Sequence, residues 1–193
     1  MDISRSTFQG NQAMGSDTFS NGGAINNGGT MTILNSTFAA NTATAAGGAI
    51  SNGTNSLTIT NSTFSGNSAP SPGGTLKGTI LLRNSIIVST AVQACTDTIT
   101  DGGANVRWTG ADSGCPGFSG NPFLGPLQDN GGPTFTMALG TGSSAILRAT
   151  ANCPAGDQRS MVRPNLPSCD SGAFEFGSTQ QLHIRIYLPL SFR

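Results

Sequence analysis

The densest group of ionisable side chains lies in the last quarter of the chain. It consists of Asp157, Arg159, Arg163, Asp170 and Glu175. Carboxylates close to cationic groups can donate and accept protons, so this group is the first candidate for general acid–base chemistry. Ion pairs and turn caps that brace a loop are the common alternative, since Asp is typical of turns. We favour the bracing role, around the loop between Cys153 and Cys169, and keep a binding or catalytic site as the alternative hypothesis.

Other residues that could carry chemistry are sparse. No Asp, Glu, Lys or Arg occurs from Thr18 to Leu76. His183 is the only histidine, which makes a catalytic triad or a histidine-ligated zinc site a poor hypothesis. Trp108 and Tyr187 are aromatic residues of the type that stacks on sugars, but each is isolated in the sequence. The sequence therefore predicts no catalytic residue, no cofactor and no metal ion. The other carboxylates that follow the uncharged segment are scattered through expected loops, at Asp97, Asp101, Asp112 and Asp129.

Composition and charge exclude several classes of protein. The 193 residues have a formal net charge of zero, and only 9% of them are charged, well below the roughly 25% that is usual for soluble domains. Such a chain lacks the basic surface that binds nucleic acid. No apolar run approaches the ~20 residues that a membrane-spanning helix needs. The 27 glycines and the many Ser, Thr and Asn residues leave either disorder or a β-rich repeat.

Two interleaved motifs decide this question, because both recur with one period of about 26 residues. The first is Ser-Thr-Phe-x-x-Asn, with its phenylalanine at Phe8, Phe38 and Phe64, and a weaker fourth copy begins at Leu82. The second is a Gly-Gly pair followed by small and apolar residues, at 22–25, 47–50 and 73–76. Within each repeat, apolar residues alternate with Thr, which indicates short strands. Each repeat therefore predicts one coil of a parallel β-helix.

The repeat gives the polar and aromatic positions a structural role. Asn tolerates the left-handed conformation of tight turns, and stacked Asn side chains can hydrogen-bond from one coil to the next. Phenylalanines in one register are expected to stack inside the coils. The Asn-x-Ser/Thr sequons at 35–37, 52–54 and 61–63 recur with the repeat, so we interpret them as turn and ladder positions rather than glycosylation sites. Three sets are expected to line up: Asn11, Asn41 and Asn67; Asn35, Asn61 and Asn84; and Phe8, Phe38 and Phe64.

These motifs resemble those of known β-helix families. Phe-x-x-Asn alternating with Gly-Gly-Ala-Ile is similar to the repeats of polymorphic outer-membrane autotransporter passengers. The second half resembles the C-terminal module of bacterial choice-of-anchor Q proteins, in the segments 121–134, 142–146, 153–159 and 169–176. Over residues 1–176 the resemblance implies an all-β, right-handed, single-stranded parallel β-helix of the pectin-lyase-like class. It also implies a secreted or surface-associated protein with no assigned enzymatic activity.

The chain departs from the family pattern at two places. Ser144 and Leu147 stand where the family usually has Pro and Asp. Ser160 follows the Asp-Gln-Arg motif where the family usually has Gly. We expect these changes to alter the local loops and not the overall fold.

Four cysteines lie outside the uncharged repeat, and they allow three disulfide pairings. A four-cysteine zinc site is the rival hypothesis, but such sites favour ligand pairs two to four residues apart, and these cysteines are farther apart. The resemblance favours the sequential pairing, Cys95 with Cys115 and Cys153 with Cys169, because each loop matches a segment of the family. Two disulfides imply an oxidising compartment.

Three regions are expected along the chain. Residues 1–94 form three to four coils and begin in mid-coil, while 95–176 hold the last coils and a disulfide-stapled cap. Residues 177–193 form a C-terminal tail, interpreted either as a sorting signal or as a strand docked on the last coil. No signal peptide precedes the first repeat, which we interpret as a truncated N-terminus of an extracellular protein.

The expected function is non-enzymatic. We expect a secreted or cell-surface β-solenoid with a structural or adhesive role, whose partner is a polysaccharide or another cell-surface protein. The alternative is a fragment of a β-helix polysaccharide lyase or hydrolase, which needs acidic and basic residues in register on successive coils. The sequence does not predict the ligand, the anchor or the oligomeric state.

Overall fold

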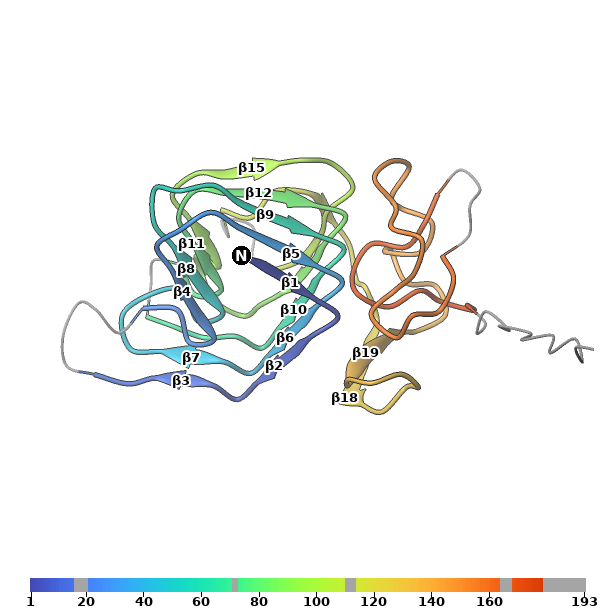
Figure 1. Cartoon of the computed structure of the whole chain (residues 1–193), viewed down its shortest axis with the longest axis horizontal. Coiled ribbons are helices and arrows are strands. Elements are labelled where there is room, and N and C mark those ends of the chain that lie inside the picture. Colours follow the sequence, from blue (N-terminus) through green and yellow to red (C-terminus); the bar gives the residue numbers. More distant parts are fainter. Residues whose placement is uncertain (16–20, 71–72, 110–113, 164–167, 179–193) are drawn as a thin grey trace, which may run out of the picture.

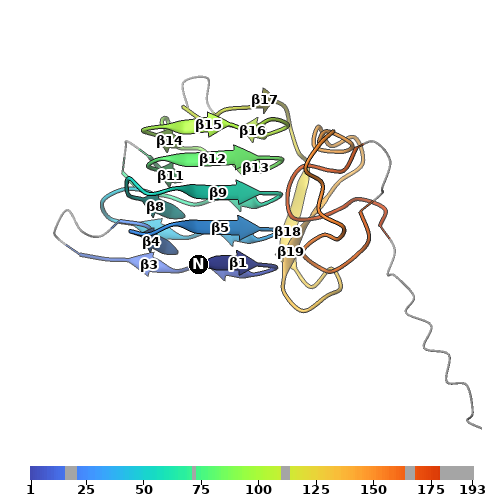
Figure 2. The same ribbon diagram turned by 45° about the horizontal axis from the view of Figure 1, so that its top comes forward.

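The structure, a computed structural model, describes residues 1–15, 21–70, 73–109, 114–163 and 168–178. These residues form an all-β structure without a helix, and most strand pairs are parallel. Successive turns of the chain stack on one another, so each strand pairs with its equivalent in the next turn (Figure 1, Figure 2). The repeat therefore folds as a β-solenoid-like stack of coils. Within the described ranges no helix is long and apolar enough to cross a membrane.

The first wall of the solenoid is a five-stranded parallel sheet, and we number the coils one to five by its strands. Side chains alternate across a strand, so Ile33 and Ile59 are buried in the interior while Thr32 and Thr58 lie on the outer face. Apolar residues that alternate with Thr are thus sufficient to form this wall. In spatial order, its strands are β1 (Asp2–Ser4), β5 (Met31–Leu34), β9 (Leu57–Thr60), β12 (Ile80–Arg83) and β15 (Ile99–Asp101).

The second wall is a six-stranded parallel sheet. Its register aligns Phe8 with Phe38 and Phe38 with Phe64. Their rings stack inside the coils with centroids 4.8 Å apart, which is the normal spacing of neighbouring strands. The aromatic column therefore follows from the stacking of equivalent coils. In coil order the strands are β2 (Thr7–Gln9), β6 (Thr37–Ala39), β10 (Thr63–Ser65), β13 (Ile86–Val88), β16 (Val106–Trp108) and β17 (Phe118–Ser119).

The third wall has four strands and closes the cross-section of the coils. The described residues include one more short pair of strands, in the connection between the second and third walls of coils one and two. Inward-pointing side chains of the three walls form one continuous interior core, which includes Phe38, Ile50, Ile59 and Leu82. The strands of the third wall are β4 (Ile25–Asn27), β8 (Ile50–Asn52), β11 (Leu76–Lys77) and β14 (Cys95–Thr96), and the extra pair is β3 (Gln12–Ala13) with β7 (Thr42–Ala43).

A Gly-Gly pair precedes the third wall in coils one to three and allows the coils to approach closely. The first glycine of the pair is left-handed, with φ of 70° at Gly22 and 65° at Gly47, a conformation that favours glycine. The second glycine faces the next coil. A Cβ added to Gly48 would lie 2.3 Å from the carbonyl oxygen of Gly74. Both positions of the motif thus exclude a side chain, for different reasons.

The coils shorten toward the C-terminal end. Equivalent residues at the corner between the first and second walls are separated by 30, 26, 23 and 20 residues. The difference lies mainly in the connection between the second and third walls, which is longest in coil one and short in coil four. The walls keep their register because the differences in length fall between the paired strands and not within them.

Residues 121–163 and 168–178 form a loop-rich unit, termed the flanking module, that lies along the side of the coils (Figure 1, Figure 2). Its described strands, β18 (Leu124–Gln128) and β19 (Thr136–Leu139), pair antiparallel. The module covers part of the outer face of the second wall. There, Ile86 and Val106 form a second core with Leu139, Ala145 and Phe174. Burial of this apolar surface holds the module against the coils.

The organisation expected from the sequence agrees with the structure only in part. Residues 95–176 were expected to hold the last coils and a cap, and β15, β16 and β17 of the coils lie in this range. Its loop-rich part, 121–163 and 168–176, does not cover the end of the stack but lies beside it and reaches back to coil one through Thr134 and Gln158. The physical reason for this position is that the outer face of the second wall carries apolar side chains. Only a segment that lies beside the coils can bury them. The expected tail, 177–193, lies outside the described residues from 179 onward.

Candidate functional site

The five ionisable residues singled out in the sequence come together in the flanking module, next to the corner between the first and second walls. All five are almost completely excluded from solvent. Asp157 is the most deeply buried, and Arg159 is the most exposed, at 9%. They form two ion pairs, Asp157 with Arg159 and Glu175 with Arg163. Their burial determines what they can do, because buried charges must be paired and hydrogen-bonded.

Asp157 organises a tight turn and closes it with Arg159. One carboxylate oxygen accepts hydrogen bonds from the backbone N–H groups of Arg159 (2.8 Å) and Met161 (3.0 Å). The other accepts from the Arg159 guanidinium (2.6 Å) and from the backbone N–H of Glu175 (3.0 Å). The guanidinium also stacks on the Phe174 ring, 3.6 Å from its centroid. Both oxygens of Asp157 are thus occupied by structural contacts.

Arg163 is the largest fully buried side chain of the described residues. Its guanidinium donates to the Glu175 carboxylate and to the carbonyl oxygens of Asp170 (3.1 Å) and Gly172 (2.7 Å). It also donates to Oδ1 of Asn35 in coil two, at 3.2 Å. Arg163 therefore joins the 170–175 segment of the module to coil two of the solenoid.

Burial perturbs the ionisation of this cluster. Desolvation raises the pKa of Asp170, although its two oxygens accept backbone N–H groups of Leu147 (2.7 Å) and Phe176 (2.6 Å). Desolvation also raises the pKa of Glu175, against the opposing positive charge of Arg163. The pKa of Arg163 is lowered for the same reason. Perturbed pKa values are common at active sites, but here the cause is burial under the module and not a solvent-filled cleft.

One expected Asn series forms the corner where the module docks. Asn35, Asn61 and Asn84 all have left-handed backbones, with φ of 48°, 45° and 46°. Their side-chain amides donate to carbonyl oxygens of the module, those of Gly156 (2.8 Å), Asp170 (3.0 Å) and Ala151 (2.9 Å), respectively. Within this series, a direct side-chain bond joins Asn84 to Asn61 at 3.3 Å. The series therefore serves as a docking row more than as a ladder.

The other expected Asn series is the hydrogen-bonded ladder. Nδ2 of Asn11 donates to Oδ1 of Asn41 (2.9 Å), and Nδ2 of Asn41 donates to Oδ1 of Asn67 (2.8 Å). Asn41 and Asn67 are buried, and each also donates to the carbonyl oxygen of a phenylalanine in the preceding coil. The two series thus have different roles, which their similar spacing in the sequence does not reveal.

Two structural elements were missed by the sequence analysis. Gln158 connects the module to coils one and two: its Oε1 accepts from Thr37 (2.7 Å), and its Nε2 donates to Oγ1 of Thr7 (2.9 Å). A serine ladder runs along the same corner, where each backbone N–H donates to the side-chain oxygen of the next coil. The recurrence of Ser in the repeat was the available signal for the ladder. For Gln158 the available signal was its place in the Asp-Gln-Arg motif, which does not indicate its contacts with the coils.

The three sequons are buried and bonded. Asn35, Asn52 and Asn61 are at most 4% exposed. Asn52 accepts a hydrogen bond from Asn27 at 2.6 Å, and the other two contact the flanking module. A glycan on any of these side chains is incompatible with the folded structure, which agrees with their interpretation as turn and ladder positions.

The four cysteines form two disulfides, Cys95–Cys115 and Cys153–Cys169. Cys95 and Cys115 belong to the interior core near its C-terminal end. Cys169 is buried in the flanking module. The next residue, Asp170, accepts a hydrogen bond from Asn61 through its carbonyl oxygen. The pairing is the sequential one, and each bridge constrains the unfolded chain by closing a local segment.

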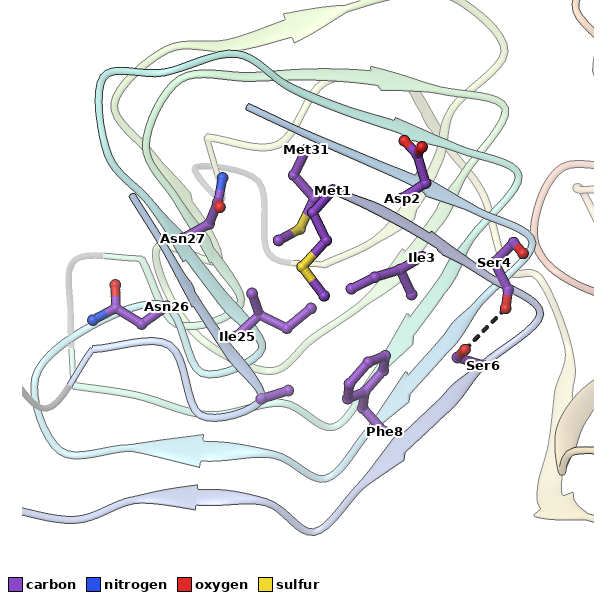
Figure 3. A pocket seen from close by; sticks show the side chains of 11 residues that line it. Met1, Asp2, Ile3, Ser4, Ser6, Phe8, Ile25, Asn26, Asn27 and Met31 are labelled. Carbon is purple, nitrogen blue, oxygen red and sulfur yellow. Dashed lines mark hydrogen bonds between the residues drawn. The ribbon is translucent and has the colours of Figure 1, made fainter. Parts of the chain in front are cut away.

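A hollow of about 710 Å³ lies at the coil-one end of the interior core. Figure 3 shows Met1, Ile3, Ile25 and Met31 pointing into it. Asp2 is the only carboxylate among its lining residues, so the hollow lacks a pair of groups for acid–base catalysis. In the described ranges, no group of three or more His, Cys, Asp or Glu residues could hold a metal ion.

The remaining candidates are dispersed. Asp97, Asp101 and Asp129 are exposed in different parts of the structure, whereas Asp112, His183 and Tyr187 lie outside the described residues. No protein-family model, curated protein or solved structure matches the chain.

Proposed function

We propose that this protein is a non-catalytic β-solenoid of the cell exterior, secreted or displayed on a bacterial surface, with a structural or adhesive role. In this proposal the coils form a right-handed, single-stranded parallel β-helix of the pectin-lyase-like class. The choice-of-anchor Q resemblance of the second half supports the same assignment, since that family is surface-associated.

The observation that carries the proposal is that the densest ionisable cluster is occupied by contacts within the protein. Both carboxylate oxygens of Asp157 and of Asp170 accept hydrogen bonds from inside the protein. Glu175 is paired with the buried Arg163. A general acid or base must reach the substrate proton, and these groups face a packed junction. Their role in the proposal is to hold the flanking module on the coils.

The exposed coil surface supports an adhesive role. Coil two contains no charged residue and coil three contains one, Lys77, while outer positions of the first wall carry side chains such as Thr32, Thr58 and Thr60. A flat wall of uncharged polar side chains can make many weak contacts with glycans or with another protein. The two disulfides support an oxidising location.

The first test concerns location. Intact cells that produce the protein are treated with a membrane-permeant thiol reagent that adds a mass tag, and the protein is then isolated. We expect no tag on any of the four cysteines unless the protein is reduced beforehand, because the disulfides form outside the cytoplasm. Tagging of all four cysteines without prior reduction would contradict an extracellular location.

The second test concerns catalysis. The purified chain is incubated with a panel of uronate polymers and neutral polysaccharides, and unsaturated products and new reducing ends are measured. We expect no release above a boiled-protein control. Release of either product overturns the non-catalytic proposal and favours the polysaccharide lyase or hydrolase instead.

A further inference from the structure

We propose that the outer face of the last strands of the second wall binds an acidic polysaccharide. The binding residues are Trp108, Phe118 and Arg148, termed the aromatic platform. The inference rests on the proposed function and deepens it, because it names a ligand class and a place on the molecule.

The platform begins where the flanking module stops covering the second wall. Val106 is buried beneath the module, whereas its register partner Phe118 in β17 is 46% exposed. Trp108, two residues beyond Val106 and on the same face, is 49% exposed. Large apolar side chains that gather on one exposed face commonly mark binding sites.

Trp108 and Phe118 lie on the same face of two paired strands. The register of β16 with β17 places Gly120 opposite Trp108, and the backbone N–H of Gly120 donates to the carbonyl oxygen of Arg107 at 3.1 Å. A Cβ on Gly120 would lie 2.7 Å from Cε1 of Phe118 and 2.8 Å from Cβ of Ser144 in the flanking module, so the Phe118 ring leans along its own strand over Gly120. Paired strands are ~4.8 Å apart, so one ligand can span the positions of both aromatic residues. Gly120 leaves the space that the ring occupies.

Arg148 adds a positive charge to this surface. It comes from the flanking module, and its Cζ lies 3.9 Å from the centroid of the Phe118 ring. Stacking fixes the plane of the guanidinium. Among the described residues, Arg148 belongs to neither of the two ion pairs. Its charge is therefore available to a ligand.

The combination selects one ligand class. The flat face of Trp108 can pack against the C–H face of a sugar ring, and the Arg148 guanidinium, which covers one face of Phe118, can bind a carboxylate through two parallel hydrogen bonds. A neutral glycan uses the rings and leaves the charge of Arg148 unpaired. A polysaccharide with uronate carboxylates uses both features, so this is the occupant that the charge of the platform favours.

The experiment compares polygalacturonate with its fully methyl-esterified form, using isothermal titration calorimetry on the full chain. We expect the acidic polymer to bind and the neutral ester to bind at least tenfold more weakly. The variants Trp108→Ala and Arg148→Gln should each weaken binding of the acidic polymer by roughly tenfold. Matched controls are Phe123→Ala, another exposed aromatic, and Lys77→Ala, another cation; neither lies on the platform, and we expect both to bind like the wild type.

Each other outcome overturns a defined part of the inference. Equal binding of the ester and the acid removes the role assigned to Arg148. Binding that Trp108→Ala and Arg148→Gln leave unchanged removes the platform, as does no binding of polygalacturonate, and both results leave the non-catalytic surface role in place. Release of unsaturated products in the same titration overturns the proposed function itself. The thermal unfolding midpoint of each variant is compared with that of the wild type, which distinguishes a loss of binding from a loss of folding.

Discussion

Arg163 of the flanking module donates a hydrogen bond from Nη2 to Oδ1 of Asn35 in coil two, at 3.2 Å and across 128 residues of sequence. Asn35 is held in a left-handed conformation by its corner position, and its Nδ2 donates to the carbonyl oxygen of Gly156. A turn residue of the repeat and the buried cation of the module thus form one unit. The stability of the whole chain is expected to depend on this contact.

Replacement of Arg163 by Met tests that dependence. The variant keeps a long side chain but leaves the buried Glu175 carboxylate without its cation. Removal of one partner of a buried ion pair costs about 3–5 kcal/mol, and we expect a loss of this size in the free energy of unfolding, measured by urea denaturation. Arg5→Met is the control, because Arg5 is exposed and its loss should cost within about 0.5 kcal/mol. Equal losses in the two variants would argue against a bracing role for Arg163.

The raised carboxyl pKa values predict how stability depends on pH. The folded protein keeps the protons of Asp170 and Glu175 at pH values above 3.8 and 4.5, where the unfolded chain releases them. This contribution to stability is complete below those values and is lost as the pH rises through the folded-state pKa values. The free energy of unfolding should therefore fall as the pH rises from about 4 and then level off.

Glu175→Gln removes one of the two titrating groups and should make this slope shallower. Ser178→Ala is a suitable control, because it deletes a hydrogen bond to the carbonyl oxygen of Glu175 and no carboxyl group. We expect that variant to lose stability at every pH without a change of slope. Urea denaturation at several pH values gives the measurement, and identical slopes in all three proteins would refute the assignment.

Gly48→Ala tests the close approach of the coils. The new Cβ would meet the backbone of the next coil, with the Gly74 carbonyl oxygen 2.3 Å away. Overpacking of this kind typically costs about 1–3 kcal/mol, and here no flexible side chain can move aside. Gly29→Ala provides the matched control, since no heavy atom lies within 4 Å of its Cβ and its φ is not positive. Thermal unfolding should separate the two variants clearly, and similar midpoints would contradict the steric argument.

Asn41→Ala tests the ladder. The side chain bonds Asn11, Asn67 and the carbonyl oxygen of Phe8, and its loss leaves buried polar groups unpaired. Each such group costs about 1–3 kcal/mol, so the expected loss in the free energy of unfolding exceeds that of an exposed Asn. Asn26→Ala, on the outer face of β4, should change stability by no more than about 0.5 kcal/mol. Urea denaturation of both variants decides whether the ladder stabilises the coils.

The repeat allowed the coils to be predicted from the sequence, because equivalent side chains recur at equivalent places. The Phe8–Phe38–Phe64 stack and the Gly-Gly corners follow from that periodicity. The position of the flanking module could not be predicted in this way. Its footprint, which includes Thr63 and Ile86, consists of ordinary outward-facing strand residues whose burial depends on a segment far away in the sequence.

The candidate site was predicted as a set of residues but not as a location. Asp157, Arg159, Arg163, Asp170 and Glu175 stand out because charge is rare in this chain. Their hydrogen-bond partners in the solenoid are uncharged residues such as Asn35, which resemble every other member of the repeat. Trp108 and Phe118 are ten residues apart in the sequence, and only strand pairing brings them onto one sheet face.

The flanking module also bears on how the coils come apart. In a bare solenoid each coil contacts only its neighbours, so the terminal coils fray before the middle ones. Here the last part of the chain contacts every coil, from Ser6 in coil one through Asn61 in coil three to Ala104 in coil five. An end coil cannot open without breaking contacts to the same module that holds the other coils. We expect native-state hydrogen exchange to show the coils and the module opening as one cooperative unit rather than peeling from one end.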